Sequence, residues 1–121
     1  MKKRGEQLCP KFQVAMEILS RPWSGLLIAV LTEGPHRFGA LSERLEPIGD
    51  RILAQRLKEL TERGLIERRV LPGPPVHVEY ALTVQGRGFS AVEEAIRVWG
   101  ESLSSVSGKK KPKAARSSAA R

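Results

Sequence analysis

The chain has 121 residues, a formal net charge of +8 and a sequence pI near 10.3. Its length predicts one domain, because domains commonly contain about 100–150 residues. The only cysteine, Cys9, excludes an intramolecular disulfide and a zinc site built from several cysteines. No apolar run approaches the ~20 residues that cross a bilayer, and no signal-peptide pattern follows the basic N-terminus. We therefore expect a cytoplasmic protein that has no membrane partner.

The positive charge is concentrated at the two ends of the chain. Residues 1–7 carry a net charge of +2 and residues 104–121 carry +6, so residues 8–103 are neutral overall. We expect 1–7 to be a flexible basic N-terminus, 8–103 to fold, and 104–121 to be a disordered tail rich in Lys and Arg. The tail has one large apolar residue, Val106, and cannot offset its ordering entropy by burial. It either strengthens non-specific DNA binding or only raises solubility.

Apolar spacing predicts the elements of the first half of the chain. Pro10 is suited to a first helical position, so the first helix covers about 10–20. A second helix begins at Pro22 and is stopped by Gly34-Pro35. The rest of this half is predicted to contain a very short strand at 37–38, a third helix over 39–45 and a turn over 46–49.

The second half begins with an amphipathic helix over about 50–63, with Gly64 as its C-cap. A strand-like segment over 65–71 and an alternating segment over 76–82 are joined by Pro72-Gly73-Pro74-Pro75, which predicts a hairpin. Thr83 then caps a long last helix over about 84–103.

The predicted order is helix, helix, strand, helix, helix, hairpin, helix. This order gives a mainly α fold with a small β-wing, in which a short helix, a turn and a longer helix precede a two-stranded hairpin. Such an arrangement is a winged helix-turn-helix, whose second helix enters the DNA major groove.

The chain resembles the HxlR family of bacterial winged-helix transcriptional regulators, which are related to the MarR type. The resemblance covers about 9–101. Each landmark is short, but their order and spacing are specific: Cys9-Pro10, Trp23, Gly34-Pro35, Arg37-Phe38, Glu62-Arg63-Gly64-Leu65-Ile66-Glu67-Arg68, Val78-Glu79-Tyr80-Ala81-Leu82-Thr83, Gly86-Arg87 and Trp99-Gly100-Glu101.

The resemblance implies a homodimeric DNA-binding repressor or activator that answers a small-molecule or oxidant effector. Two positions depart from the family pattern. Gly49 stands where a Ser is common, so the recognition helix lacks a side-chain cap. His77 stands where a wing Arg is common, so the wing lacks a permanent positive charge there.

The helix over 50–63 carries the residues expected to read DNA. At 100° per residue, Arg51, Gln55 and Lys58 lie opposite its leucines. Arg is suited to guanine and Gln to adenine by bidentate geometry, and Ala54 lets the backbone approach a base edge. We expect Arg51 and Gln55 to read bases, Lys58 to contact phosphate, and Arg56 to flank them.

Three further residues are predicted to contact DNA outside this helix. Arg37 precedes the third helix and is a candidate phosphate clamp, with a surface ion pair as the alternative. Arg69 belongs to a basic cluster that runs from 51 to 69. His77, on the wing, either contacts phosphate or the minor groove, or is simply an exposed strand residue.

The last helix carries apolar residues at steps of three and four, which is a heptad pattern. We expect it to form a homodimer interface with the first helix, although packing onto its own core is the alternative. The predicted interface residues are Phe12, Met16, Phe89, Val92, Ile96, Trp99 and Leu103. A two-fold dimer places two recognition helices about one DNA turn, ~34 Å, apart and requires a pseudo-palindromic operator.

Cys9 is a candidate sensor, because a helix dipole and nearby cations stabilise a thiolate at a helix N-terminus. The alternative is a small buried residue or an unused thiol. His36, His77 and Cys9 lack metal-ligand spacing, so neither a metal nor a cofactor is expected. The chain shows no catalytic set and is not expected to be an enzyme. We expect a sequence-specific regulator associated with the nucleoid; the alternative is a non-specific DNA binder driven by the tail.

Overall fold

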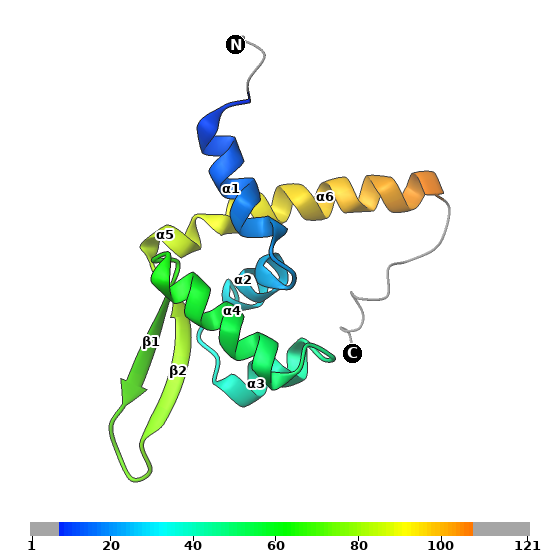
Figure 1. Ribbon diagram of the computed structural model, residues 1–121. Coiled ribbons are helices and arrows are strands. Elements are labelled where there is room, and N and C mark those ends of the chain that lie inside the picture. Colours follow the sequence, from blue (N-terminus) through cyan, green and yellow to red (C-terminus); the bar gives the residue numbers. More distant parts are fainter. Residues whose placement is uncertain (1–7, 108–121) are drawn as a thin grey trace.

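The computed structural model describes residues 8–107. The predictions for residues 1–7 and for the tail from residue 108 onward lie outside the described residues. Figure 1 shows the arrangement of the helices and strands. In chain order they are α1 (Pro10–Ser20), α2 (Ser24–Leu31), α3 (Phe38–Arg44), α4 (Asp50–Glu62), β1 (Ile66–Leu71), β2 (His77–Leu82), α5 (Val84–Arg87) and α6 (Phe89–Ser107).

Helix α2 lies at the centre of the core. Its sequence is apolar on nearly every side, which is typical of a buried helix. Leu27 and Ile28 are at most 2% exposed, and α2 contacts α1, α3, α6 and β2. From the other elements, the core receives Leu41, Leu45, Ile48, Leu53, Leu57, Leu60, Ile66 and Leu82. The predicted apolar face of α4 is therefore confirmed.

Helices α3 and α4 are joined by a turn that ends at Gly49. Gly49 has φ 81°, a left-handed conformation that glycine adopts without a Cβ clash. No side chain caps α4, as predicted from the presence of Gly49 where the family pattern has Ser. Instead, the Ser42 hydroxyl of α3 donates a hydrogen bond to the Asp50 carboxylate, with 2.9 Å between Oγ and Oδ1. This bond joins the two helices of the helix-turn-helix at the start of α4.

The two strands form an antiparallel hairpin whose register runs from Ile66 opposite Leu82 to Leu71 opposite His77. Figure 1 shows this hairpin projecting from the helical body as a wing. Its base is buried through Ile66 and Leu82, whereas Val70 and Val76 near its tip are more than half exposed. The predicted hairpin is confirmed.

The strand predicted at 37–38 is wrong. The residue that bridges to β2 is His36, which exchanges two backbone hydrogen bonds with Tyr80 (N···O 3.0 and 2.7 Å). Arg37 is instead the N-cap of α3, and Phe38 is its first helical residue. Phe38 packs against the core from this helical position, so the chain turns into α3 immediately after one bridging residue.

The single helix predicted over 84–103 is two helices, α5 and α6, separated at Gly88. Thr83 caps α5 as predicted, because its hydroxyl accepts a hydrogen bond from the Gly86 N–H at 3.1 Å. Gly86 lies against the start of the wing, where an added Cβ would be 2.1 Å from the Leu65 carbonyl oxygen. Two glycines within three residues weaken a continuous helix, which explains the break.

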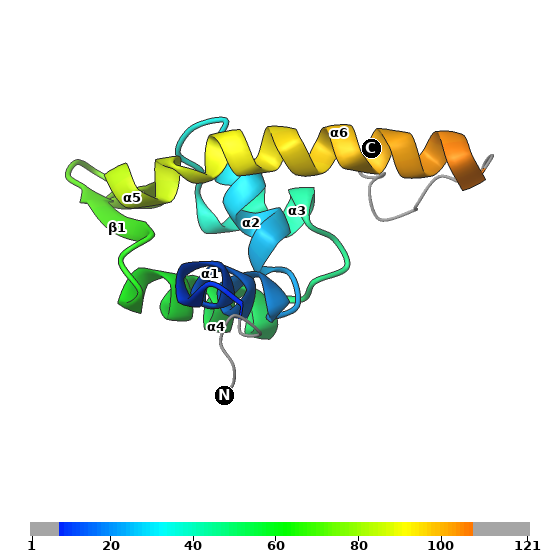
Figure 2. The same ribbon diagram turned by 90° about the horizontal axis from the view of Figure 1, so that it is seen from above.

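Helix α6 also extends to Ser107, four residues beyond its predicted end. No Gly or Pro stands between Leu103 and Ser107 to stop it. Seen from above in Figure 2, α6 lies beside α2 and continues well beyond it. Among the described residues, no single helix is long and apolar enough to cross a membrane; α1 and α2 pass that test only together, and they meet at 92°.

Candidate DNA-binding site

Helix α4 presents a polar face to solvent. Arg51, Ala54, Gln55 and Lys58 are exposed, whereas the leucines at 53, 57 and 60 are at most 2% exposed. The helix therefore has the orientation that its sequence predicted. A small residue between Arg51 and Gln55 leaves the backbone accessible to a base edge. The arrangement can present a bidentate donor and an amide to a groove without rearranging the core.

The predicted place of Arg56 beside this face is wrong. Five residues separate it from Arg51, which turns it about 140° around the helix. Arg56 is 6% exposed, and its Nε donates a hydrogen bond to the Pro22 carbonyl oxygen at 2.8 Å. Its Nη1 forms an ion pair with Glu59 at 3.4 Å. Arg56 therefore contacts the segment between α1 and α2 and cannot reach DNA from this position.

Lys58 forms an exposed ion pair with Glu62, with 2.9 Å between Nζ and Oε2. The hydrogen bond to Glu62 raises the pKa of the Lys58 ammonium, so it is fully charged at neutral pH. Exposed ion pairs of this kind are weak. Lys58 can therefore exchange the Glu62 carboxylate for a phosphate at little cost.

Arg69, on β1, is paired with two carboxylates. Its Nε is 2.7 Å from Glu67 Oε2, and its Nη1 is 3.4 Å from Glu79 Oε2 on the neighbouring strand. The hydrogen bond that Arg69 donates to Glu67, and secondarily the one it donates to Glu79, raises the pKa of Arg69. Two acids offset its charge, which weakens the case for Arg69 as a phosphate contact.

Arg68 is a wing cation that the candidate set omitted. It is exposed and makes no ion pair with another residue of the described part of the chain. Strand alternation carries the signal that could have found it, because Arg68 lies on the opposite side of β1 from Arg69 and its two acids.

His77 is the first residue of β2 and is half-buried opposite Leu71. Arg37 is exposed and also makes no ion pair within residues 8–107.

Cys9 occupies the N-cap position of α1, as predicted, and its side chain is exposed. Its carbonyl oxygen accepts a hydrogen bond from the Gln13 N–H at 3.0 Å, which begins the helix. The thiol is thus accessible to a soluble oxidant or electrophile. Within the described residues, no three His, Cys, Asp or Glu side chains are grouped as a metal site would require.

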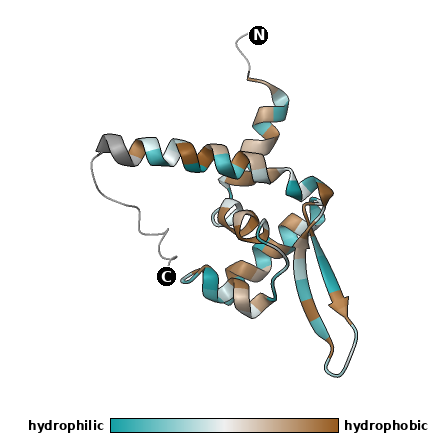
Figure 3. Ribbon diagram, turned by 180° about the vertical axis from the view of Figure 1, so that it is seen from behind, coloured by the Kyte–Doolittle hydropathy of each residue, from teal (hydrophilic) through white to brown (hydrophobic). Residues whose placement is uncertain are grey.

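Helices α1 and α6 expose apolar side chains where they project from the body. Figure 3 shows hydrophobic segments along α6, away from the core. The exposed predicted interface residues are Phe12 (53%), Met16 (46%), Val92 (41%), Ile96 (45%), Trp99 (63%) and Leu103 (49%). Phe89 differs, because it packs against the core of its own chain at the start of α6. Val14 on α1, Val98 on α6 and Leu26 on α2 are also exposed, and none of them was predicted to belong to the interface.

A cavity of about 420 Å³ lies between the base of α6 and the segment that joins α1 to α2. Its walls include Trp23, Leu26, Phe89 and Ile96, with Arg21 among the polar residues. Ile96 therefore belongs both to this cavity and to the exposed apolar side of α6.

The helix-turn-helix with its apolar side in the core, the exposed polar face of α4 and the projecting hairpin define a winged helix-turn-helix DNA-binding protein. Residues 18–107 match the family model described as HxlR-like helix-turn-helix. The chain belongs to this family of transcriptional regulators, as its sequence motifs predicted.

Two curated relatives in Bacillus subtilis (strain 168) support this assignment. The HTH-type transcriptional regulator YodB is 41% identical over 97 residues, which cover 80% of this chain and 87% of YodB. The uncharacterized HTH-type transcriptional regulator YvaP is 37% identical over 93 residues, covering 77% and 86% respectively.

Solved structures agree. The reduced form of YodB from B. subtilis superposes with a TM-score of 0.72 at 41% identity, covering 78% of this chain and 93% of YodB. Quinone-bound YodB from B. subtilis superposes with a TM-score of 0.69 at 38% identity, covering 78% of this chain and 99% of YodB. The redox regulator HypR in its oxidized form superposes with a TM-score of 0.71 at 31% identity, covering 78% of this chain and 96% of HypR.

Proposed function

We propose that this regulator binds a specific pseudo-palindromic operator as a homodimer. The carrying observation is the exposed face of α4, where Arg51, Ala54, Gln55 and Lys58 lie on a helix held to the core by three leucines. Arg37 and the wing, through Arg68 and His77, supply further polar contacts at its flanks. In this proposal the protein acts on chromosomal DNA and is associated with the nucleoid.

The dimer is supported by the apolar sides of α1 and α6. A monomer that exposed this set of large side chains on two projecting helices would be prone to association. Packing two copies through these helices removes the apolar side chains from water and gives two recognition helices related by a two-fold axis. Sedimentation should find a dimer for the wild type and a folded monomer for Trp99→Asp combined with Ile96→Asp. A double variant that remained a dimer would place the interface elsewhere.

We further propose that DNA binding responds to oxidants or electrophiles through Cys9. Its exposed N-cap position supports the proposal. The relative YodB has been solved in reduced, diamide-treated and quinone-bound forms, and HypR in oxidized and reduced forms. A disulfide through Cys9 would join two subunits, because the chain has no second cysteine. Diamide should change the operator affinity of the wild type and leave that of Cys9→Ser unchanged.

Selection of operators from a random DNA pool tests the function. We expect the purified protein to enrich a two-fold symmetric site whose half-sites are about one helical turn apart. Enrichment of no sequence, together with binding that disappears when residues 104–121 are deleted, would instead favour a non-specific binder driven by the tail.

A further inference from the structure

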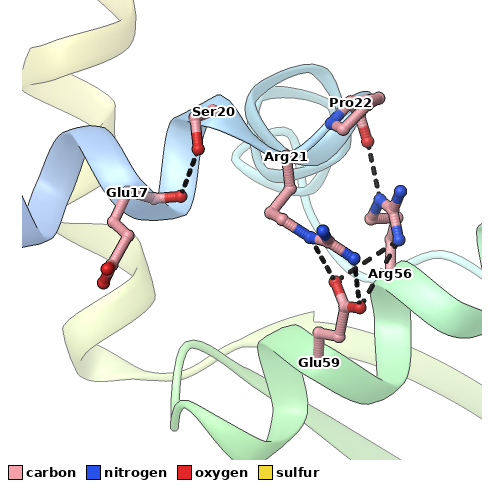
Figure 4. A network of polar contacts seen from close by, with 6 residues as sticks. All are labelled: Glu17, Ser20, Arg21, Pro22, Arg56 and Glu59. Atoms are coloured by element: carbon pink, nitrogen blue, oxygen red, sulfur yellow. Dashed lines mark hydrogen bonds and ion pairs between the residues drawn. The ribbon is translucent and has the colours of Figure 1, made fainter.

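Arg56 is unusual because arginine is almost never fully buried unless it is paired. Its side chain lies beneath α4, where its Nε donates to the Pro22 carbonyl oxygen at 2.8 Å and its Nη1 is 3.4 Å from Glu59 Oε1. Figure 4 shows these contacts. Because a buried charge is costly unless its hydrogen bonds are satisfied, this guanidinium strongly favours one position of α4 relative to Pro22.

Glu59 extends the same contacts to a second arginine. Arg21, just after α1, donates from Nη2 to Glu59 Oε2 at 2.9 Å and from Nε to Oε1 at 3.4 Å. The Glu59 carboxylate therefore accepts hydrogen bonds from both guanidinium groups. We call these four residues the Arg56–Glu59 network: Arg21, Pro22, Arg56 and Glu59. Hydrogen bonding from Arg21 lowers the pKa of Glu59, and the charge of Arg56 adds to the effect, so the carboxylate is ionised at neutral pH.

The segment that the network holds is strained. Trp23 follows Pro22 with φ 75°, a left-handed conformation that is an outlier for a bulky residue. Such strain persists only where surrounding contacts over-determine it. The Pro22 carbonyl that Arg56 holds is part of the peptide bond leading into Trp23, and the Trp23 ring packs against the core. The network thus joins α4 to the segment Arg21–Trp23, whose backbone conformation is fixed by its surroundings.

The leucines of α4 do not by themselves define its orientation so sharply. Apolar burial is non-directional, so small rotations or shifts of α4 retain much of it. Hydrogen bonds weaken steeply when their angles change. Arg56 lies one residue from Gln55 and five from Arg51, on the same helix. A small rotation that breaks the network therefore also turns both predicted base-reading side chains.

We propose that Arg56 and Glu59 are positioning residues, which set the orientation of α4 against the α1–α2 segment so that Arg51 and Gln55 face the base edges. The proposal rests on the proposed function in DNA binding. Arg56 acts through the helix and does not touch DNA, because its side chain is only 7% exposed.

The test compares Glu59→Gln and Arg56→Met with Glu33→Gln. Glu33 is a matched control because it also accepts two hydrogen bonds from one arginine, Arg44, at 2.8 and 3.0 Å. We expect both network variants to lose about tenfold or more in affinity for the selected operator, which is the scale of one lost base contact. Their affinity for non-specific DNA and its salt slope should be unchanged, and Glu33→Gln should match the wild type. Arg56→Lys should recover part of the loss, since an ammonium can still donate to the Pro22 carbonyl.

A salt slope reduced by about one for each subunit, or about two for the dimer, would make Arg56 a phosphate contact, and unchanged operator affinity in both network variants would overturn the proposal. Tryptophan fluorescence gives a readout without DNA. In a Trp99→Phe background Trp23 is the only tryptophan, and its emission should shift to the red in Arg56→Met but not in Glu33→Gln. A wild type without any operator preference refutes the proposed function. Unchanged emission in Arg56→Met refutes the link between Arg56 and the α1–α2 segment, so the two failures are distinguishable.

Discussion

Replacing Arg51 and Gln55 by alanine, singly and together, should weaken operator binding without unfolding the protein. Seven residues separate Arg51 from Lys58, and the helical rise of about 1.5 Å per residue places them about 10 Å apart along the axis. This distance covers roughly three base pairs at about 3.4 Å each. Both side chains are exposed, so each change in the free energy of unfolding should be within about 0.5 kcal/mol.

The affinity change follows from the number of base contacts removed. A bidentate contact contributes about 1–3 kcal/mol of discrimination, which corresponds to roughly 5- to 150-fold in affinity for each half-site. Fluorescence anisotropy on the selected operator, and on operators mutated one base pair at a time, measures this. Arg51→Ala should relax the preference at a guanine in each half-site, and Gln55→Ala the preference at an adenine.

Arg97→Ala and Gln85→Ala are controls matched in residue type and exposure, and they lie on α6 and α5, although Arg97 also pairs with Glu93 and Glu101. Neither control should alter the base preference. The reasoning is refuted if Arg51→Ala and Gln55→Ala weaken binding to every sequence equally. It is also refuted if they leave the operator affinity unchanged while the controls reduce it.

Three further outcomes are expected. Deleting residues 104–121 removes six cations from each subunit and twelve from the proposed dimer, so the salt slope of DNA binding should fall by at most about 11 while the sequence preference is retained; a lost preference would contradict this. The low pKa of Glu59 stabilises the fold above the ordinary value of 4.5, and this contribution is lost as the pH falls through the lowered pKa. The Tm difference between the wild type and Glu59→Gln should therefore shrink below pH 4.5, and a constant difference would argue against the ion pair. Leu53 is fully buried, so Leu53→Ala should cost about 3–5 kcal/mol and lower Tm by at least about 10 °C; a negligible change would contradict the assigned core.

The winged helix-turn-helix could be predicted because its signals are local. Pro10, Gly34-Pro35 and Gly64 mark helix boundaries, and the leucines of α4 repeat at helical spacing. The strand at 37–38 could not be predicted correctly, because the backbone bridge between His36 and Tyr80 joins residues 44 positions apart. The break at Gly88 depends on the contact of Gly86 with the Leu65 carbonyl, which is also non-local.

The candidate site shows the same division. Helical periodicity placed Arg51, Ala54, Gln55 and Lys58 on the exposed side of α4. It also carried enough information to place Arg56 elsewhere, since five residues correspond to about 140° of rotation. What the sequence could not supply was the partner that makes burial of Arg56 tolerable, the Pro22 carbonyl 34 residues away. For Arg69, cross-strand pairing with Glu79 became visible only once the register was known.

Site-specific photo-crosslinking to the selected operator tests most directly the claim that the exposed face of α4 reads DNA. A photoreactive amino acid is introduced at Ala54, and in a matched protein at Ala95, because both alanines are exposed and lie on helices. We predict crosslinks from position 54 to bases in both half-sites and none from position 95. Crosslinks from position 95 alone, or equal crosslinking from both positions, would contradict the account.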